Sequence, residues 1–251
     1  MTFYLESLGC AKNQVESELI IERLRRAGFT PSAEAGGADI ILVNTCGFIE
    51  EAKQQSINTA LDFRREYPRK KIVLTGCLAV RYAQELRESL TEVDGVYEKP
   101  DTAGLAAWLG EVCGFTCYGL AGSSQAVPSQ TAAPEATRPL LSPAGSAYVR
   151  VADGCDNGCS FCAIPLIRGR LRSRGADEVA AECQALLARG VKEICLVAQD
   201  LAAYGRDRAG ESRLASLLER ITRIQGDFWI RLLYLHPDHF PYEILPVAQA
   251  D

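Results

Sequence analysis

The sequence has no apolar run that approaches the ~20 residues needed to cross a bilayer. Its first residues, Met1 to Glu6, contain neither the basic nor the apolar segment of a secretory signal peptide. Basic residues are not in excess, since 27 Lys and Arg stand against 32 Asp and Glu, for a net charge of −5. This segment therefore lacks the electrostatic signature of a nucleic-acid binder. Histidine is scarce as well, with only His236 and His239 in the chain.

Cysteine, by contrast, is abundant, with ten residues in a chain of 251. Without an export signal, such thiols are expected to remain reduced in the cytoplasm and to serve as metal ligands rather than as disulfides. The composition, 47% apolar and 24% charged, is that of a globular protein long enough for one large or two ordinary domains. We therefore expect a cytoplasmic protein that does not span a membrane.

Three cysteines, Cys155, Cys159 and Cys162, lie on one short loop together with Gly154 and Gly158. Zinc favours four ligands in two pairs, so this spacing fits it poorly. Iron–sulfur clusters take runs of closely spaced thiolates, and three ligands on a four-iron cluster leave one iron open for chemistry. The alternative is a structural loop with incidental cysteines. We favour the cluster, because the glycines let the backbone fold closely around it.

Strand and helix patterns alternate in the first part of the chain, which predicts a parallel sheet with helices on both faces, a doubly wound α/β domain over residues 1–120. Glycine or proline ends several of the elements. The expected strands cover residues 3–8, 39–44 and 71–75 and a short run near Val96. The expected helices cover about 15–28, 48–67, 80–90 and 102–111.

Cys10, Cys46 and Cys77 each follow the carboxyl end of one of these strands and are each next to a glycine. All carboxyl ends of an open parallel sheet lie along one edge, where ligands bind. The three thiols are therefore predicted to form a second cluster site that is assembled by the fold. The alternative is that they are buried cysteines acting as small hydrophobic residues. For Cys113, Cys117, Cys183 and Cys195, a role as packing or surface thiols is preferred.

Residues 121–146 are rich in proline and small polar residues and are predicted to be a linker. Residues 147–251 then show the strand–helix repeat of a β/α barrel, whose active groups sit at the carboxyl ends of the strands. The cluster loop follows the first of these strands, and Gln199 and Asp200 follow the second. Three strands make less than half of a barrel, so we expect a partial barrel belonging to a longer protein.

Two further features have open interpretations. Alternating arginines, whose side chains would share one face of an extended segment, are either a solvated basic stretch or a clamp for a carboxylate. They are Arg168, Arg170, Arg172 and Arg174. His236 and His239 have a spacing that could bind a metal, but no further ligand is near them in sequence, so a loop after the third strand is preferred.

The cluster loop resembles the signature of the radical S-adenosylmethionine (SAM) enzymes. With the second trio, nearly the whole chain resembles the methylthiotransferases of that superfamily. The matching stretches are Ser7-Leu-Gly-Cys-Ala-Lys-Asn13, Asn44-Thr-Cys-Gly-Phe-Ile49, Thr75-Gly-Cys-Leu78, Gly154–Cys162 and Ala198-Gln-Asp with Tyr204-Gly205. They are most similar to the branch that modifies a small-subunit ribosomal protein. Ala11 departs from that branch, which usually has proline there, and the rest of the barrel and a small C-terminal β domain are absent.

The resemblance implies a fold, a chemistry and partners. A doubly wound domain would be followed by the first part of a radical SAM barrel. Two [4Fe-4S] clusters, one on Cys10, Cys46 and Cys77 and one on the loop trio, would act with two molecules of SAM. Phe161 would lie against the adenine, and Gln199 and Asp200 are candidate cofactor contacts. The product would be an aspartate methylthiolated at its β-carbon, and a low-potential electron donor would be required.

Three alternatives remain open from the sequence. A tRNA-modifying methylthiotransferase would share every cluster ligand, and the acidic balance of this segment disfavours it only weakly. A non-enzymatic iron–sulfur electron carrier would use four ligands per cluster and bind no SAM. A structural zinc protein would contain zinc and no sulfide. Breaking an unactivated C–H bond needs no general base, which agrees with the lack of histidine beside the cysteine motifs.

Overall fold

The computed structural model describes residues 1–114, 135 and 137–250, and the chain divides into two compact units, Met1–Pro139 and Leu140–Asp251. Most of the expected linker, residues 121–134 and 136, lies outside the described residues. Within the described residues, no helix is both long enough and apolar enough to cross a bilayer.

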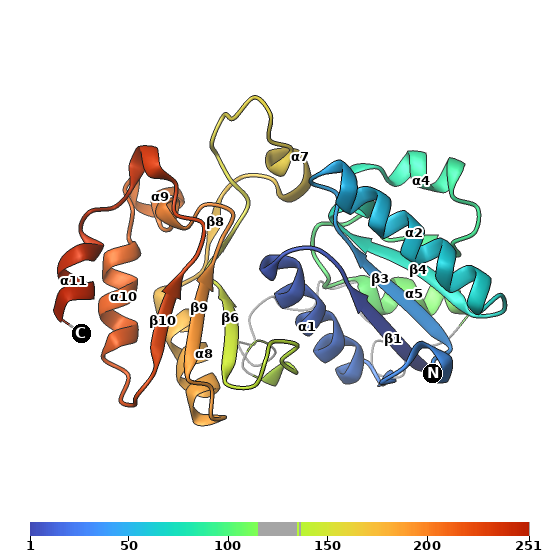
Figure 1. Ribbon diagram of the computed structural model, residues 1–251, viewed down its shortest axis with the longest axis horizontal. Helices are drawn as coiled ribbons and strands as arrows, with labels where there is room; N and C mark the ends of the chain where they lie inside the picture. The colour runs from blue at the N-terminus through green and yellow to red at the C-terminus, as the bar shows by residue number, and fades with distance from the viewer. Residues whose placement is uncertain (115–134, 136, 251) are drawn as a thin grey trace. The chain divides into compact units, whose positions relative to one another are not determined.

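The first unit contains a fully parallel sheet, in the strand order β2-β1-β3-β4-β5 among the described residues (Figure 1). Its strands are β1 (Thr2–Ser7), β2 (Thr30–Pro31), β3 (Ile40–Thr45), β4 (Lys71–Gly76) and β5 (Gly95–Val96). Its helices are α1 (Ala11–Arg26), the one-turn η1 (Ala35–Gly37), α2 (Glu50–Glu66), α3 (Cys77–Arg81), α4 (Ala83–Ser89) and α5 (Leu105–Cys113). The strand order reverses between β1 and β3, so these two strands flank the topological switch point at which doubly wound sheets bind ligands.

Alternate residues of β3 face opposite layers, as the period of a strand requires. Ile40 and Leu42 pack with α1 and α5, whereas Ile41 and Val43 pack with α2, α3 and α4. All four are fully buried, which explains the continuous apolar sequence of this central strand. The expected doubly wound α/β fold is confirmed. The single helix expected over 80–90 is wrong, because α3 begins at Cys77 itself and the helical backbone breaks at Tyr82, which separates α3 from α4.

The second unit contains a parallel sheet in the order β10-β9-β6, and its described residues also include an antiparallel pair, β7 with β8. Its strands are β6 (Ser146–Arg150), β7 (Ala152–Asp153), β8 (Arg172–Ser173), β9 (Glu193–Val197) and β10 (Trp229–Leu232). Its helices are α7 (Ile164–Arg168), α8 (Ala176–Ala188), η2 (Leu201–Ala203), α9 (Arg206–Ala209), α10 (Leu214–Thr222), η3 (Pro237–His239) and α11 (Ile244–Ala250).

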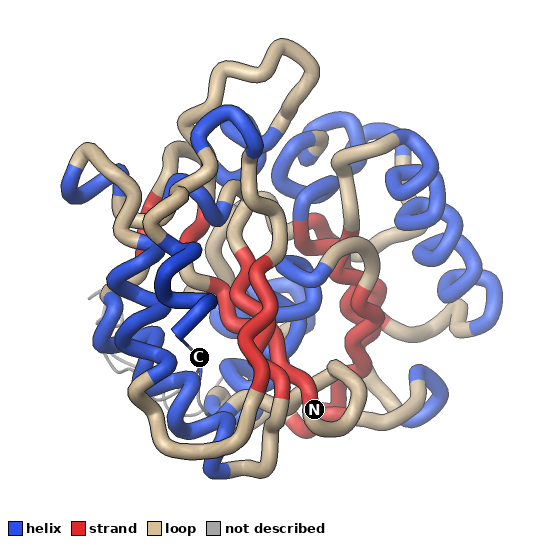
Figure 2. Tube along the Cα trace, turned by 60° about the vertical axis from the view of Figure 1, so that its left-hand side comes forward, coloured by secondary structure: helices blue, strands red, loops and turns tan. Residues whose placement is uncertain are grey.

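Helices α8 and α10 lie on one face of this sheet (Figure 1 and Figure 2). The apolar cluster packed there includes Val179, Ile194 and Leu217. Successive parallel strands joined through helices are the pattern with which a β/α barrel begins. Helix α8 begins at Ala176. Gly175 is the N-cap. The Asp177 carboxylate lies in the first turn, where its negative charge interacts favourably with the positive end of the helix dipole.

The connection between the units is anchored to α1 before it leaves the first unit. Arg138, within the stretch expected to be linker, is fully buried, and its Nε lies 2.9 Å from Oε2 of Glu18, which is also fully buried. Beside this pair, the Thr137 hydroxyl donates to Glu22 Oε1 at 3.0 Å. The end of the stretch is therefore ordered packing rather than open linker.

Candidate functional site

Cys10, Cys46 and Cys77 lie just beyond the carboxyl ends of three neighbouring strands, β1, β3 and β4. Register pairs Ser7 with Asn44, and Thr45 with Gly76, so the strands end level with one another. The Cys10 side chain is exposed, and those of Cys46 and Cys77 are partly exposed. All three can therefore be reached from outside the core.

Two glycines let the cysteine loops touch one another. A methyl group at Gly9 would lie 2.8 Å from Cβ and 3.1 Å from Sγ of Cys46, so the backbone before Cys10 abuts the Cys46 side chain. At Gly47 a methyl group would lie 2.7 Å from Leu78 N and 3.0 Å from the carbonyl carbon of Cys77. The loop of Cys10 thus touches Cys46, and the loop of Cys46 touches the start of α3. Only glycine permits approaches this close.

Buried polar side chains hold the ends of the strands together. Asn13, on the first turn of α1, donates through Nδ2 to the carbonyl oxygens of Leu8 at 2.5 Å, Asn44 at 3.2 Å and Thr45 at 3.3 Å. Asn44 returns a hydrogen bond to Asn13 O at 3.0 Å, and Thr45 Oγ1 donates to Thr75 O at 2.6 Å. Side chains of the sequence motifs around the cysteines therefore fix the backbone from which the thiols project.

The donor set is suited to an iron–sulfur cluster. Within the described residues, no three Cys, His, Asp or Glu side chains converge on one point as the ligands of a single metal ion do. A four-iron cluster binds each thiolate to a different iron, so its ligands do not share a point. Soft thiolates on adjoining glycine-bearing loops are the kind of ligand that an iron–sulfur cluster takes.

Cys155, Cys159 and Cys162 lie, all partly exposed, on the loop between β7 and α7. Gly154, with φ +76°, is packed so tightly that a methyl group there would overlap the carbonyl oxygen of Arg170. Cys155 N donates to Gly169 O at 3.1 Å, which closes the base of the loop. Farther along, Cys162 N donates to Cys159 O at 3.1 Å, and Phe161 is 86% exposed.

Asp153 connects the start of this loop to the end of β9. Its Oδ1 accepts from Gln199 Nε2 at 2.8 Å and from Gly154 N at 3.2 Å, and Oδ2 lies 3.5 Å from Arg150 NH1. Burial would by itself raise the pKa of Asp153, but Arg150, Arg168 and these hydrogen bonds lower it below its usual value. The amide orientation leaves Gln199 Oε1 buried and, among the described residues, without a hydrogen-bond partner. Gln199 thus presents an acceptor beside the loop.

Asp200 is only 3% exposed and is hydrogen bonded on both carboxylate oxygens. Oδ1 accepts from Ala202 N at 3.1 Å, and Oδ2 lies 2.8 Å from Asn157 Nδ2 and 2.6 Å from His239 Nε2. Asp200 therefore braces the loops around it. Sequence reasoning gave Asn157 no role and assigned His239 only to a loop after the third strand. The available signal was that Asn157 lies within the cysteine loop and that His239 follows the third strand, at the edge where Asp200 lies.

Burial, Asn157 and Asp200 all affect the pKa of the Cys155 thiol. Burial raises the pKa of the Cys155 thiol and the Asp200 carboxylate raises it further, whereas the backbone N–H of Asn157, 3.4 Å from Sγ, opposes the shift. A metal that binds this sulfur must therefore displace a proton, which makes metal binding pH-dependent.

The alternating arginines do not share one face, because residues 168–174 do not form one extended segment. Arg168 ends α7 and is buried, Arg170 is exposed, and Arg172 belongs to β8. Arg174 is held by Glu182, with NH1 2.6 Å from Oε2. The backbone turns between these residues, so the extended geometry that the alternation required does not form.

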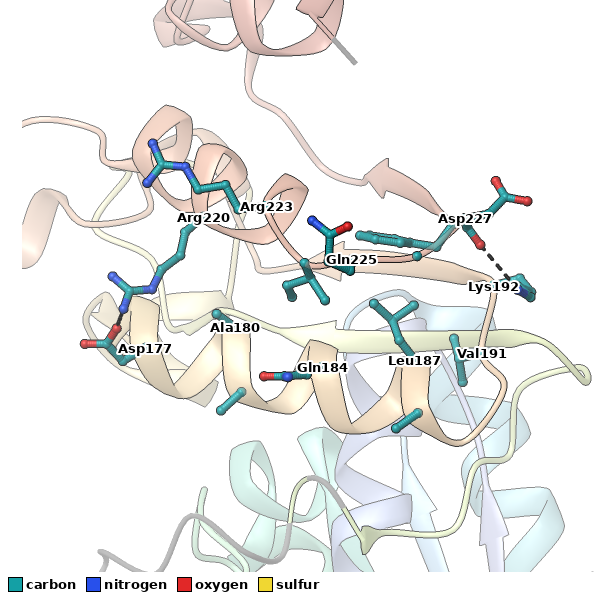
Figure 3. A pocket seen from close by; sticks show the side chains of 15 residues that line it. Asp177, Ala180, Gln184, Leu187, Val191, Lys192, Arg220, Arg223, Gln225 and Asp227 are labelled. Atoms are coloured by element: carbon teal, nitrogen blue, oxygen red, sulfur yellow. Dashed lines mark hydrogen bonds and ion pairs between the residues drawn. The ribbon is translucent and has the colours of Figure 1, made fainter.

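A groove of about 700 Å³ lies between α8 and α10 (Figure 3). Leu187, Val191 and Phe228 supply apolar walls, and an ion pair between Asp177 and Arg220 spans one end. Part of its lining, Val191 and Phe228 among it, lies just before β9 and β10, whereas the cysteine loop lies between β7 and α7. This groove is therefore separate from the cysteine site.

Comparisons with known proteins found similar sequences and similar folds. A family model described as "Uncharacterized protein family UPF0004" matches residues 2–98. Proteins named ribosomal protein uS12 methylthiotransferase RimO are 42% identical in Treponema denticola, over 97% of this chain and 55% of the relative, and 40% identical in Akkermansia muciniphila, over 97% and 58%. The protein of that name in Desulfotalea psychrophila is 42% identical over 100% of this chain and 56% of the relative. The chain spans about half the length of the curated relatives that it matches.

Two solved structures share the fold. A radical S-adenosylmethionine methyltransferase, TsrM from Kitasatospora setae, with cobalamin and a [4Fe-4S] cluster bound, has a TM-score of 0.59 at 15% identity, over 99% of this chain and 58% of that one. The cobalamin-dependent S-adenosylmethionine radical enzyme OxsB has a TM-score of 0.54 at 10% identity, over 91% and 38%. At these identities the likeness concerns the fold alone.

Proposed function

We propose that this chain, a homologue of the RimO proteins over nearly its whole length, provides the cluster-binding units of a radical SAM methylthiotransferase. The observation that carries the proposal is the presence of two separate cysteine trios, each at the carboxyl edge of a parallel sheet. Cys10, Cys46 and Cys77 would hold one [4Fe-4S] cluster, and Cys155, Cys159 and Cys162 the other. A single trio would support only a generic radical SAM enzyme.

The two sites would divide the chemistry. When bound, the cluster of the second unit supplies, with SAM, the radical that removes a hydrogen atom, and the cluster of the first unit carries the methylthio group. The protein binds and orients these groups. Asp153 holds the Gln199 amide beside the loop, where Gln199 would be a candidate contact to the cofactor, and exposed Phe161 would provide a surface for the adenine. Asp200 holds the cysteine loop through its hydrogen bond with Asn157.

The substrate proposed is an aspartate of a small-subunit ribosomal protein, as the names of the relatives suggest. The reaction would then occur in the cytoplasm and draw electrons from a low-potential donor. A tRNA-modifying enzyme of the same family would use identical cluster ligands, so only the substrate separates the two. An unactivated C–H bond is broken by hydrogen-atom abstraction, so no side chain is required as a general base.

The test uses the full-length protein as its gene encodes it, reconstituted with iron and sulfide under anaerobic conditions. It is incubated with SAM, a reductant and either the ribosomal protein uS12 or unmodified tRNA. We expect mass spectrometry to find an added methylthio group on one aspartate of uS12. Modification of tRNA alone would reassign the substrate, and zinc in place of iron would refute the cluster chemistry.

A further inference from the structure

Three loops at the carboxyl edge of the second sheet are joined by a short chain of hydrogen bonds. The loop after β10 contributes His239, the loop after β9 contributes Asp200, and the cysteine loop contributes Asn157. A backbone hydrogen bond from Leu201 N to Tyr234 O, at 2.9 Å, also joins the loop after β9 to the loop after β10. Among the described residues, Tyr234 is the one non-glycine residue with positive φ, at 66°, a conformation that costs free energy and needs surrounding support.

Burial limits the hydrogen-bond partners that the side chains of His239, Asp200 and Asn157 can reach. Asp200 is nearly excluded from solvent, and a buried carboxylate is costly unless it is hydrogen bonded. Asp200 Oδ2 lies 2.6 Å from His239 Nε2, and the Nε2–H tautomer of the ring donates to that oxygen. Stacking of the His236 and His239 rings, with centroids 4.8 Å apart and planes 4° apart, fixes the direction of that donor. The bonded chain then continues through Asn157 to the backbone beside Cys155.

We infer that His239 is a positioning residue for the cysteine loop, although it lies far along the sequence from Cys155. It holds Asp200, Asp200 holds the Asn157 amide, and Asn157 holds its own N–H toward the Cys155 sulfur. This inference rests on the proposed function, because it assigns the purpose of that arrangement as a preformed cluster site. Among the described residues, the recorded side-chain contacts of His239 are to Asp200 and His236 rather than to a cysteine.

The test measures alkylation of individual cysteines in the metal-free full-length protein by peptide mass spectrometry. His239→Phe keeps the stacked ring and removes the donor, whereas His239→Gln restores a donor at the same reach. Asp238→Ala is the matched control, because Asp238 lies in the same turn, is 84% exposed and has no recorded bond to Asp200. Cys183, which is fully buried, reports unfolding of the unit.

We expect alkylation of Cys155 to rise about tenfold in His239→Phe, the factor that loss of a charge-assisted hydrogen bond gives to local opening. His239→Gln and Asp238→Ala should react like the unchanged protein, and Cys46 should react equally in all variants. If His239→Phe also exposes Cys183, Asn157→Ala replaces it as the variant that cuts the chain, with the same increase expected. The inference would be overturned if the variant that stays folded, His239→Phe or Asn157→Ala, showed the same rate of Cys155 alkylation as the unchanged protein.

A second readout separates this inference from the proposed function. After reconstitution, the hydrogen bonds around a cluster tune its reduction potential, so His239→Phe should shift the potential of the Cys155 cluster while His239→Gln does not. Absence of any iron–sulfur cluster from the unchanged protein would refute the proposed function. A normal cluster whose potential and loop reactivity ignore His239 would refute the positioning role alone.

Discussion

Replacement of Gly9 by alanine tests whether the loops of Cys10 and Cys46 must touch. Gly9 has φ +92°, and its added methyl group would press against the Cys46 side chain at 2.8 and 3.1 Å. Gly28, after α1, offers a matched control, because it has φ +90° and no atom within 4 Å of the corresponding methyl position. Both substitutions introduce the same backbone strain, and only Gly9→Ala adds the contact.

The expected magnitudes follow from these two terms. An alanine at such a φ costs about 1–2 kcal/mol, and both variants bear this cost. Overpacking against a fixed neighbour adds about 1–3 kcal/mol, which applies to Gly9→Ala alone. Gly9→Ala should therefore be less stable than Gly28→Ala by about 1–3 kcal/mol. Since relief of the contact requires the Cys46 side chain to move, the first-unit site should also lose its cluster.

Urea unfolding of the metal-free protein measures the stability difference. Trp108, in α5, reports the first unit if Trp229 is replaced by phenylalanine, because the chain has only these two tryptophans. Iron analysis after reconstitution measures the site, and Gly9→Ala should bind half the iron of Gly28→Ala. Equal stability and equal iron in the two variants would show that the contact between Gly9 and Cys46 does not shape the site.

Three further perturbations test other parts of the structure. Gly154→Ala would overlap a backbone carbonyl and should lose the second cluster, whereas Gly158→Ala, with no atom within 4 Å, should keep its iron. Burial opposes ionisation of Asp94, but hydrogen bonds from Lys71, Ile72 N and Arg64 lower its pKa, so its contribution exists at neutral pH and disappears as the pH falls through that lowered value. Asp94→Asn should therefore lower the unfolding free energy at pH 7 by about 1–2 kcal/mol and by progressively less as the pH falls through the lowered pKa, and a loss that does not change with pH would contradict this assignment. Arg138→Met should lower the free energy of unfolding by about 3–5 kcal/mol, because it removes the cation that is paired with the buried Glu18 carboxylate. Adding Glu18→Leu should recover most of that loss, as measured by urea unfolding.

The sequence predicted the features that depend on local pattern. Continuous apolar runs such as Ile40–Val43 identified the buried strands, and the position of a cysteine after each strand identified the sheet edge. Parallel strands place their carboxyl ends together whatever the side chains do. The doubly wound fold and the location of Cys10, Cys46 and Cys77 at one edge could therefore be predicted before any coordinates.

Features that depend on contacts between distant segments could not be predicted. Asp200 and His239 are 39 residues apart, and only the folded loops bring their side chains together. Arg138 looked like part of a polar linker because its buried partner, Glu18, is 120 residues away. Arg168 and Arg174 alternate with other arginines in sequence, but a helix end and a turn direct them differently. Local periodicity contains no information about such pairings.

Iron and acid-labile sulfide content of the reconstituted protein tests the central claim, two independent cluster sites, most directly. The unchanged protein is compared with Cys46→Ala, Cys159→Ala and the double variant under identical anaerobic conditions. The account predicts that each single variant keeps half of the iron and sulfide, with distinct spectra for the remaining cluster, and that the double variant keeps none. Unchanged iron and sulfide in Cys46→Ala would contradict the claim, because the trio at the first sheet edge would then hold no cluster.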